Sequence, residues 1–141
     1  MNWFYWALGS AFFAGLTAIL AKVGVEGMDS NVATALRTTV VVCFTWGIVI
    51  FSGLTSNISQ LNGSSVLFLV LSGLATGASW LCYFRALQLG EASQVAPVDK
   101  LSVVFVLLFA ALFLGEKMHW QTILGAALIV GGVVILSQQG H

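Results

Sequence analysis

Five long apolar runs dominate this sequence, and they constrain its fold more than any other feature. Each run is long enough to cross a hydrocarbon core of roughly 30 Å as an α-helix. The apolar residues are continuous rather than alternating, which argues against the strands of a membrane barrel. Helices also satisfy their own backbone hydrogen bonds, as lipid requires. The sequence therefore predicts an all-α integral membrane protein, a bundle of five transmembrane helices at about residues 3–21, 32–51, 65–86, 95–114 and 119–136.

The composition supports this fold class. Charged residues make up 7% of the chain, against roughly 25% in a soluble domain, so the lipid bilayer must be the main solvent. The net charge is +0 and no basic run occurs, so we expect no nucleic-acid partner. Little sequence lies between the runs, and we expect residues 1–141 to form a single transmembrane domain. No Lys or Arg precedes the first run, which we interpret as a mature helix rather than a signal peptide.

An odd number of spans places the two termini on opposite sides of the membrane. Lys22, Arg37, Arg85 and Lys100 lie near the first–second and third–fourth connections, whereas Lys117 alone lies near the other side. Positively charged connections remain preferentially cytoplasmic. We therefore expect an outside N-terminus and an inside C-terminus, in a multi-pass protein of the cell inner (plasma) membrane. The bias is small, so insertion in both orientations stays an alternative.

Four charged side chains fall within or at the edge of the predicted spans: Arg37, Arg85, Asp99 and Lys100. A charge there costs roughly 2.5–3.5 kcal/mol and usually faces a cavity, so all four are candidates for substrate binding or coupling. Asp99 is singled out, because a partly dehydrated carboxylate takes up a proton more readily and can couple transport to protons or hold a cationic substrate. The alternatives for Asp99 are an ion pair with Arg37, Arg85 or Lys100, or a favourable charge at a helix start.

Lys100 lies about 100° from Asp99 around a helix, which argues against a pair between these two residues. Snorkelling to the headgroups accounts for Lys100.

Pro97 lies near the start of the fourth predicted span. Proline lacks an N–H donor and fits the first turn of a helix, which is the position we expect. If the helix begins earlier, Pro97 would kink it and free a carbonyl group near Asp99, as in the broken helices of transporter sites.

Aromatic residues form two groups. Trp46, Trp80 and Tyr83 lie deep in their spans, where they either pack or line a pocket for a hydrophobic or cationic ligand. The others mark the predicted membrane interfaces, where amphipathic rings are favoured: Trp3, Tyr5, Trp6 and Trp120.

Small residues at helical spacing predict a packing seam. Gly73 and Gly77 lie in the third run, and Gly125 and Gly132 lie in the fifth. Such residues allow helix backbones to approach closely. The seam could serve contacts within one bundle or between two chains.

We expect no metal and no cofactor, and we expect that the protein is not an enzyme. Cys43 and Cys82 lie within apolar runs, lack metal-site clustering, and are expected to be buried small hydrophobic residues. His119 and His141 lack a helical histidine partner. The sequence has no phosphate-binding GxxxxGK[ST] loop and no nucleophile–base set.

Four segments together resemble a known family. They are SWLCYFRALQLG (79–90), ASQVAPVDKLS (92–102), LGEK (114–117) and GAALIVGG (125–132). Their order resembles the EamA domain of the drug/metabolite transporter superfamily, and more narrowly its single-domain five-helix members. The resemblance covers essentially the whole chain and is most specific from Tyr83 to Glu116.

This resemblance implies a transporter of small metabolites with a substrate path among its helices. Larger members of the superfamily carry two such domains in opposite orientations, so one domain implies a homodimer, either parallel or antiparallel. Related small multidrug transporters use a glutamate in the first helix, but the first span here has no carboxylate. We therefore expect a secondary transporter of small organic solutes, driven by an ion gradient. The alternative is a non-transporting membrane subunit that stabilises or regulates a partner.

Overall fold

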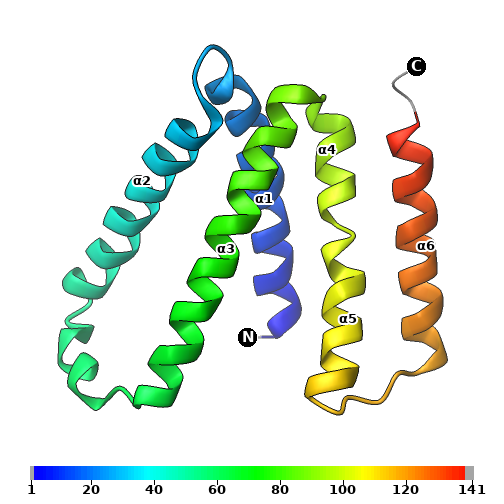
Figure 1. Ribbon diagram of the computed structural model, residues 1–141. Helices are drawn as coiled ribbons and strands as arrows, with labels where there is room; N and C mark the ends of the chain where they lie inside the picture. The colour runs from blue at the N-terminus through cyan, green and yellow to red at the C-terminus, as the bar shows by residue number, and fades with distance from the viewer. Residues whose placement is uncertain (1, 139–141) are drawn as a thin grey trace. The chain divides into compact units, whose positions relative to one another are not determined.

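The computed structural model describes residues 2–138, and its regular structure there is helical. Among these residues, five helical stretches are long and apolar enough to cross a membrane. The predicted all-α fold with five spans is confirmed, and the largest boundary difference, residue 21 against Val25, is at the end of the first span. Figure 1 shows the helices as α1 (Trp3–Val25), α2 (Ser30–Phe51), α3 (Gly63–Leu89), α4 (Ala92–Asp99), α5 (Ser102–Phe113) and α6 (Trp120–Ser137).

The chain divides into two compact units. The hairpin unit is Val23–Gln88 and contains α2 and nearly all of α3. The terminal unit contains most of α1 together with α4, α5 and α6, and its described residues are those of 2–22 and 89–138.

In the hairpin unit, α2 and α3 are connected by a hydrogen bond at one end and lie further apart at the other. Near the start of α2, the side-chain amide of Gln88 donates to the Met28 carbonyl at 2.6 Å. At the other end, Gly53 adopts a positive φ of 68° and leads into a 3₁₀-helix, η1 (Leu54–Gln60), which lies between the second and third predicted spans. Figure 1 shows α2 and α3 diverging from the Met28 end toward η1. The two helices are therefore bridged near Met28 and separated near η1.

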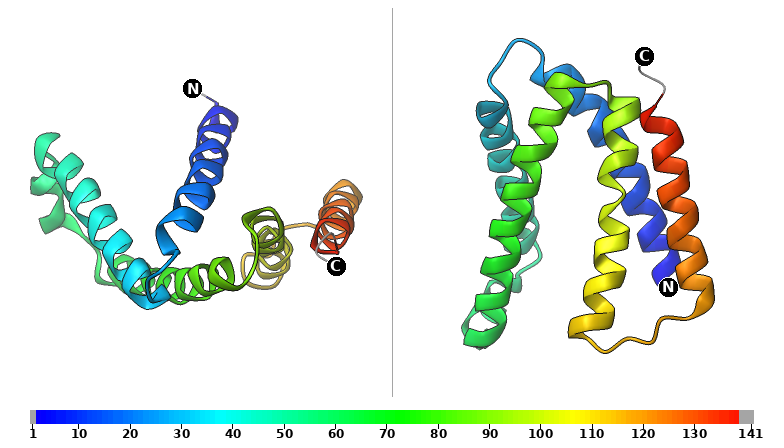
Figure 2. Two further views of the ribbon diagram at one scale, coloured as in Figure 1. Left: turned by 90° about the horizontal axis from the view of Figure 1, so that it is seen from above. Right: turned by 45° about the vertical axis from the view of Figure 1, so that its right-hand side comes forward.

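The terminal unit contains the fourth span, which is broken. α4 packs against α6, and the two helices lie side by side in both views of Figure 2. α4 ends at Asp99 and α5 begins at Ser102. The expectation that Pro97 occupies a first helical turn is wrong, because α4 already begins at Ala92 and Pro97 lies inside it. The alternative, an earlier helix start with a break close to Asp99, is what the structure has.

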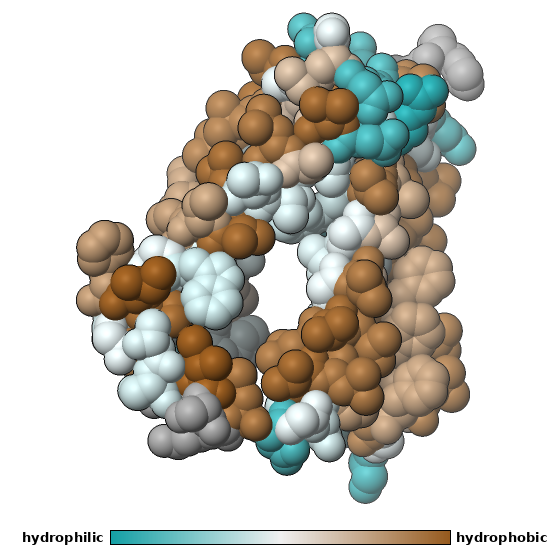
Figure 3. Space-filling view, turned by 60° about the vertical axis from the view of Figure 1, so that its left-hand side comes forward, coloured by the Kyte–Doolittle hydropathy of each residue, from teal (hydrophilic) through white to brown (hydrophobic). Residues whose placement is uncertain are grey.

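Most large apolar side chains are exposed, as expected when lipid is the solvent. Leu87 and Val25 are the largest fully buried side chains among the described residues. Figure 3 shows hydrophobic side chains along the helices and hydrophilic ones gathered near their ends. Cys43 and Cys82 are free and exposed, so the expectation that they are buried is wrong. Apolar packing within the chain is therefore limited, and polar contacts stand out.

Candidate functional site

Arg37 meets two aromatic rings inside the hairpin unit. It lies seven residues after the first residue of α2, Ser30, which is roughly 10 Å along the helix. Its guanidinium carbon Cζ lies 4.5 Å from the ring centroid of Trp80 and 5.4 Å from that of Phe84, both on α3. Both distances are within the roughly 6 Å range of cation–π attraction. The structure thus brings together two predicted site residues, Arg37 and Trp80, and adds Phe84.

The guanidinium of Arg37 lies beside rings that are set back from the end of α3. Gln88, bonded to Met28, marks the end of the hairpin unit. From Gln88, Phe84 lies roughly 6 Å and Trp80 roughly 12 Å along α3, at about 1.5 Å per residue. The guanidinium lies beside both rings, so it is set back from Gln88 at the end of the hairpin unit.

Other polar side chains of α2 are satisfied by the helix itself. The hydroxyls of Thr34, Thr38, Thr39 and Thr45 each donate to the carbonyl four residues earlier, at 2.8–3.0 Å. Such bonds allow hydroxyl groups to lie in an apolar span without an external partner. The threonines therefore have a structural explanation.

Arg37 has no equivalent explanation. Within residues 2–138 the structure gives its guanidinium no hydrogen bond and no ion pair. Two cation–π contacts together contribute roughly 1–2 kcal/mol at a partly exposed site. An arginine costs roughly 2.5–3.5 kcal/mol at the centre of a span, and the rings offset part of such a cost.

Tyr83 belongs to the same group of residues. Its side chain is half-buried, and it directly precedes Phe84 on α3. Trp46, the third deep aromatic residue, is exposed on α2. We call Arg37, Trp80, Tyr83 and Phe84 the arginine cluster. It combines a positive charge, free N–H donors and aromatic surface in one place.

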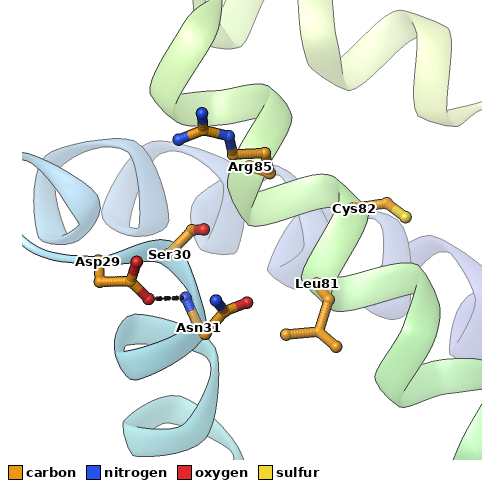
Figure 4. Close-up of a pocket in the computed structure, with 6 residues that line it drawn as sticks. All are labelled: Asp29, Ser30, Asn31, Leu81, Cys82 and Arg85. Carbon is orange, nitrogen blue, oxygen red and sulfur yellow. Dashed lines mark hydrogen bonds between the residues drawn. The ribbon is translucent and has the colours of Figure 1, made fainter.

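A polar pocket lies at the Met28 end of the hairpin unit, and Arg85 belongs to this pocket rather than to the arginine cluster. Arg85 is exposed, and its Nη1 donates to Oε1 of Gln88 at 3.0 Å. Asp29 Oδ1 accepts from the backbone N–H of Asn31 at 2.8 Å, as the cap of α2. The open pocket has a volume of about 520 Å³ and is lined by Asp29, Ser30, Asn31, Leu81, Cys82 and Arg85 (Figure 4).

Two residues at this end of the hairpin unit escaped prediction from the sequence. Gln88 joins α3 to the loop before α2, and Asp29 caps α2. Asp29 had a usable signal, because an aspartate directly before an apolar run is a common helix start. Gln88 had only the weaker signal of a polar residue in the last turn of an apolar span.

Asp99 and Lys100 form an ion pair at the break between α4 and α5. Lys100 Nζ lies 3.2 Å from Asp99 Oδ2, so the expectation that these two side chains do not pair is wrong. The 100° argument holds for rigid side chains on a continuous helix. Here α4 ends at Asp99, and the flexible Lys100 stem folds back onto the carboxylate. The ion-pair alternative for Asp99 is therefore found, with Lys100 as the partner.

The predicted glycine seam makes no close contact in the structure. A Cβ atom built on Gly73, Gly77, Gly125 or Gly132 would meet nothing within 4 Å. Gly73 and Gly132 are exposed. A seam at these positions stays a prediction.

Comparisons with known proteins agree with the membrane architecture. The model of the EamA-like transporter family matches residues 1–138, across both units. An uncharacterized transporter in the cobO 3' region of a Sinorhizobium species is 53% identical over 136 residues, or 96% of each chain. Human solute carrier family 35 member G1 is 28% identical over 128 residues, which are 91% of this chain but 34% of that protein. No solved structure matches. The chain is therefore a membrane transporter that belongs to the EamA-like transporter family.

Proposed function

We propose that the protein is a secondary transporter that moves a small organic solute across the cell inner membrane. In this proposal an ion gradient drives transport, and two copies of the chain work together as a homodimer. The observation that carries the proposal is the break between Asp99 and Ser102, within a span that is otherwise apolar. Broken helices are common at the binding and coupling sites of secondary transporters.

The backbone around the break has the form of a hinge. Pro97 has no N–H to donate, so one helical hydrogen bond is lost inside α4. The N–H groups of Lys100 and Leu101 then bond to the carbonyls of Pro97 and Val98, both at 3.0 Å and three residues back. A short 3₁₀ stretch within a helix often marks a functional hinge. This geometry supports a fourth span that bends during alternating access.

In this proposal Asp99 connects a proton to the hinge. Its ion pair with Lys100 is partly exposed, with side-chain exposures of 36% and 57% for Asp99 and Lys100. Pairs of this kind contribute only about 0–1 kcal/mol, so the pair is easily broken. In the proposed mechanism, a proton neutralises the Asp99 carboxylate, releases Lys100 and changes the bending of the span.

The proposed homodimer is supported by the paired domains of related transporters. Transporters built from repeated halves place the solute path at the interface of the halves. This chain matches 34% of the length of its human relative, and the EamA resemblance implies paired domains in larger members. In the proposed homodimer, a second copy of this domain takes the place of the paired domain.

Proton movement in liposomes tests the proposal. Purified protein is reconstituted around a trapped pH-sensitive dye, and a panel of amino acids, monocarboxylates, sugars and organic cations is added outside. We expect at least one solute class to move protons with the wild type. Asp99→Asn should abolish the proton signal, because the amide cannot be protonated in this range. Glu116→Gln, which removes an exposed carboxylate from the α5–α6 connection, should behave as the wild type.

Two results would count against parts of the proposal. Solute flux without proton movement in wild type and variant alike would remove Asp99 from coupling. Absence of flux for the entire panel, together with stoichiometric capture of an unrelated membrane protein in mild detergent, would favour the non-transporting subunit. Crosslinking in the membrane that yields only monomers would contradict the homodimer.

A further inference from the structure

The arginine cluster has the chemistry of an anion-binding site, and we propose that it binds the anionic group of the transported solute. The substrate is then an organic anion that carries a carboxylate or phosphate on a small apolar body. This inference rests on the proposed transport function and names its substrate class. It concerns only residues of the hairpin unit.

The guanidinium of Arg37 has hydrogen-bond donors that could bind an anion. A guanidinium has five N–H donors in a fixed planar fork, which matches the two oxygens of a carboxylate. Within residues 2–138 none of these donors has a hydrogen-bond partner, although the side chain is half-buried. The fork is therefore available, and an anion is the group that would use it best.

The rings of Trp80 and Phe84 bear on the charge of the ligand. Aromatic faces deep in a span would on their own attract a cationic ligand. Here the guanidinium of Arg37 already lies 4.5 Å and 5.4 Å from those two ring centroids. A cationic ligand would meet a like charge at the same place. The site therefore selects against cations, and the half-buried ring of Trp80, unlike the buried ring of Phe84, leaves surface for the apolar part of an anion.

The position of the arginine cluster along α3 favours a solute anion over a lipid headgroup as the group that Arg37 binds. The guanidinium stays level with rings that lie roughly 6–12 Å along α3 from Gln88. Arg85, near the end of α3 and exposed, is much better placed for a lipid phosphate. We therefore assign a solute anion, rather than a phospholipid, to Arg37.

Binding in phospholipid-free micelles tests this assignment without depending on transport. The full chain in dodecyl maltoside is dialysed against labelled phenylacetate, with succinate and inorganic phosphate as competing anions. We expect saturable binding of at least one of these anions. Phenylacetamide and phenethylamine, which have the same ring but no negative charge, should not compete with phenylacetate. Tryptophan fluorescence should change on binding, and Trp80→Phe should remove that change because Trp80 lies against Arg37.

Variants of Arg37 give the decisive comparison. Arg37→Gln should abolish saturable binding, and Arg37→Lys should weaken it at least tenfold because an ammonium cannot bind two oxygens with a planar fork. Lys117→Gln, which removes an exposed cation from the α5–α6 connection, should bind as the wild type. Arg37→Lys keeps the positive charge. Size-exclusion profiles that match the wild type would show that the variants are folded, so that a loss of binding does not come from unfolding.

Several results would overturn the proposal. These are equal binding by wild type and Arg37→Gln, equal competition by phenylacetamide, or no saturable binding of any of the three anions. A lipid site would instead show Arg37-dependent binding of phosphatidylglycerol and none of phenylacetate, which also overturns it. Binding without flux in liposomes would leave this site standing and refute the proposed transport. Solute flux that is unchanged in Arg37→Gln would support the proposed transport and refute this binding site.

Discussion

Asp29 and Arg37 are two charged residues in the N-terminal part of α2, and their surroundings differ. Asp29 lies just before the helix, and its carboxylate accepts two backbone N–H groups that the first turn leaves free. Arg37 lies within the helix, and its guanidinium lies over the rings of Trp80 and Phe84. Asp29 therefore contributes to the stability of the helix, whereas Arg37 is the residue to which we assign binding.

Loss of the Asp29 cap should destabilise the protein by a modest and measurable amount. Asp29→Ala leaves two N–H groups of α2 without an acceptor and should cost about 1 kcal/mol of unfolding free energy. Unfolding in mixed micelles with increasing dodecyl sulfate, followed by circular dichroism, measures this change. Asp29→Asn is the matched control, because asparagine caps almost as well. An equal loss in both variants would show that charge, not capping, is what matters at this position.

At the level of elements, the spans could be predicted and the break could not. Long apolar runs identify membrane helices directly, because the bilayer imposes both length and polarity. The break depends on where α4 begins. Ser93 and Gln94 are polar, and the predicted fourth span begins after them at residue 95, which places Pro97 in a first turn. In the structure these two residues are already helical, and this shift of three residues turns a favourable proline into an interruption.

Removal of Pro97 should stiffen the fourth span. Pro97→Ala restores an N–H donor inside α4 and removes the ring that clashes with the preceding turn. We expect slower hydrogen exchange of the amides at residues 97–104 and a several-fold lower rate of solute-driven proton movement. Val98→Ala, a neighbouring exposed side chain, is the control and should change neither. Faster exchange in Pro97→Ala would contradict the view that the proline maintains the break.

At the scale of the whole molecule, the sequence predicted the class of protein better than the site. Composition and run length establish a membrane protein of five spans, and the motif order indicates the family. The meeting of Arg37 with Trp80 and Phe84 is different, because it depends on how two distant helices face each other. No periodicity within one span specifies that contact. The sequence could name Arg37 and Trp80 as candidates but could not join them or add Phe84.

Five spans should place the ends of the chain on opposite sides of the membrane. In a variant with Cys43 and Cys82 replaced by serine, Asn2→Cys should react with an impermeant maleimide in intact spheroplasts. Gln138→Cys should react only after permeabilisation, since the Lys22 and Arg85 connections favour the cytoplasmic side. Partial labelling of both positions in intact cells would instead indicate insertion in two orientations.

The unequal helix lengths have a consequence for the bilayer itself. α3 has 27 residues and α6 has 18, which correspond to roughly 40 Å and 27 Å. A hydrocarbon core of roughly 30 Å is thus shorter than α3 and slightly longer than α6. The long helix must tilt or extend into the headgroups, while the short one draws the lipids around it thinner. Membrane thickness thereby acts on these two helices of one chain in opposite directions, and we expect the transport rate to depend on lipid acyl length.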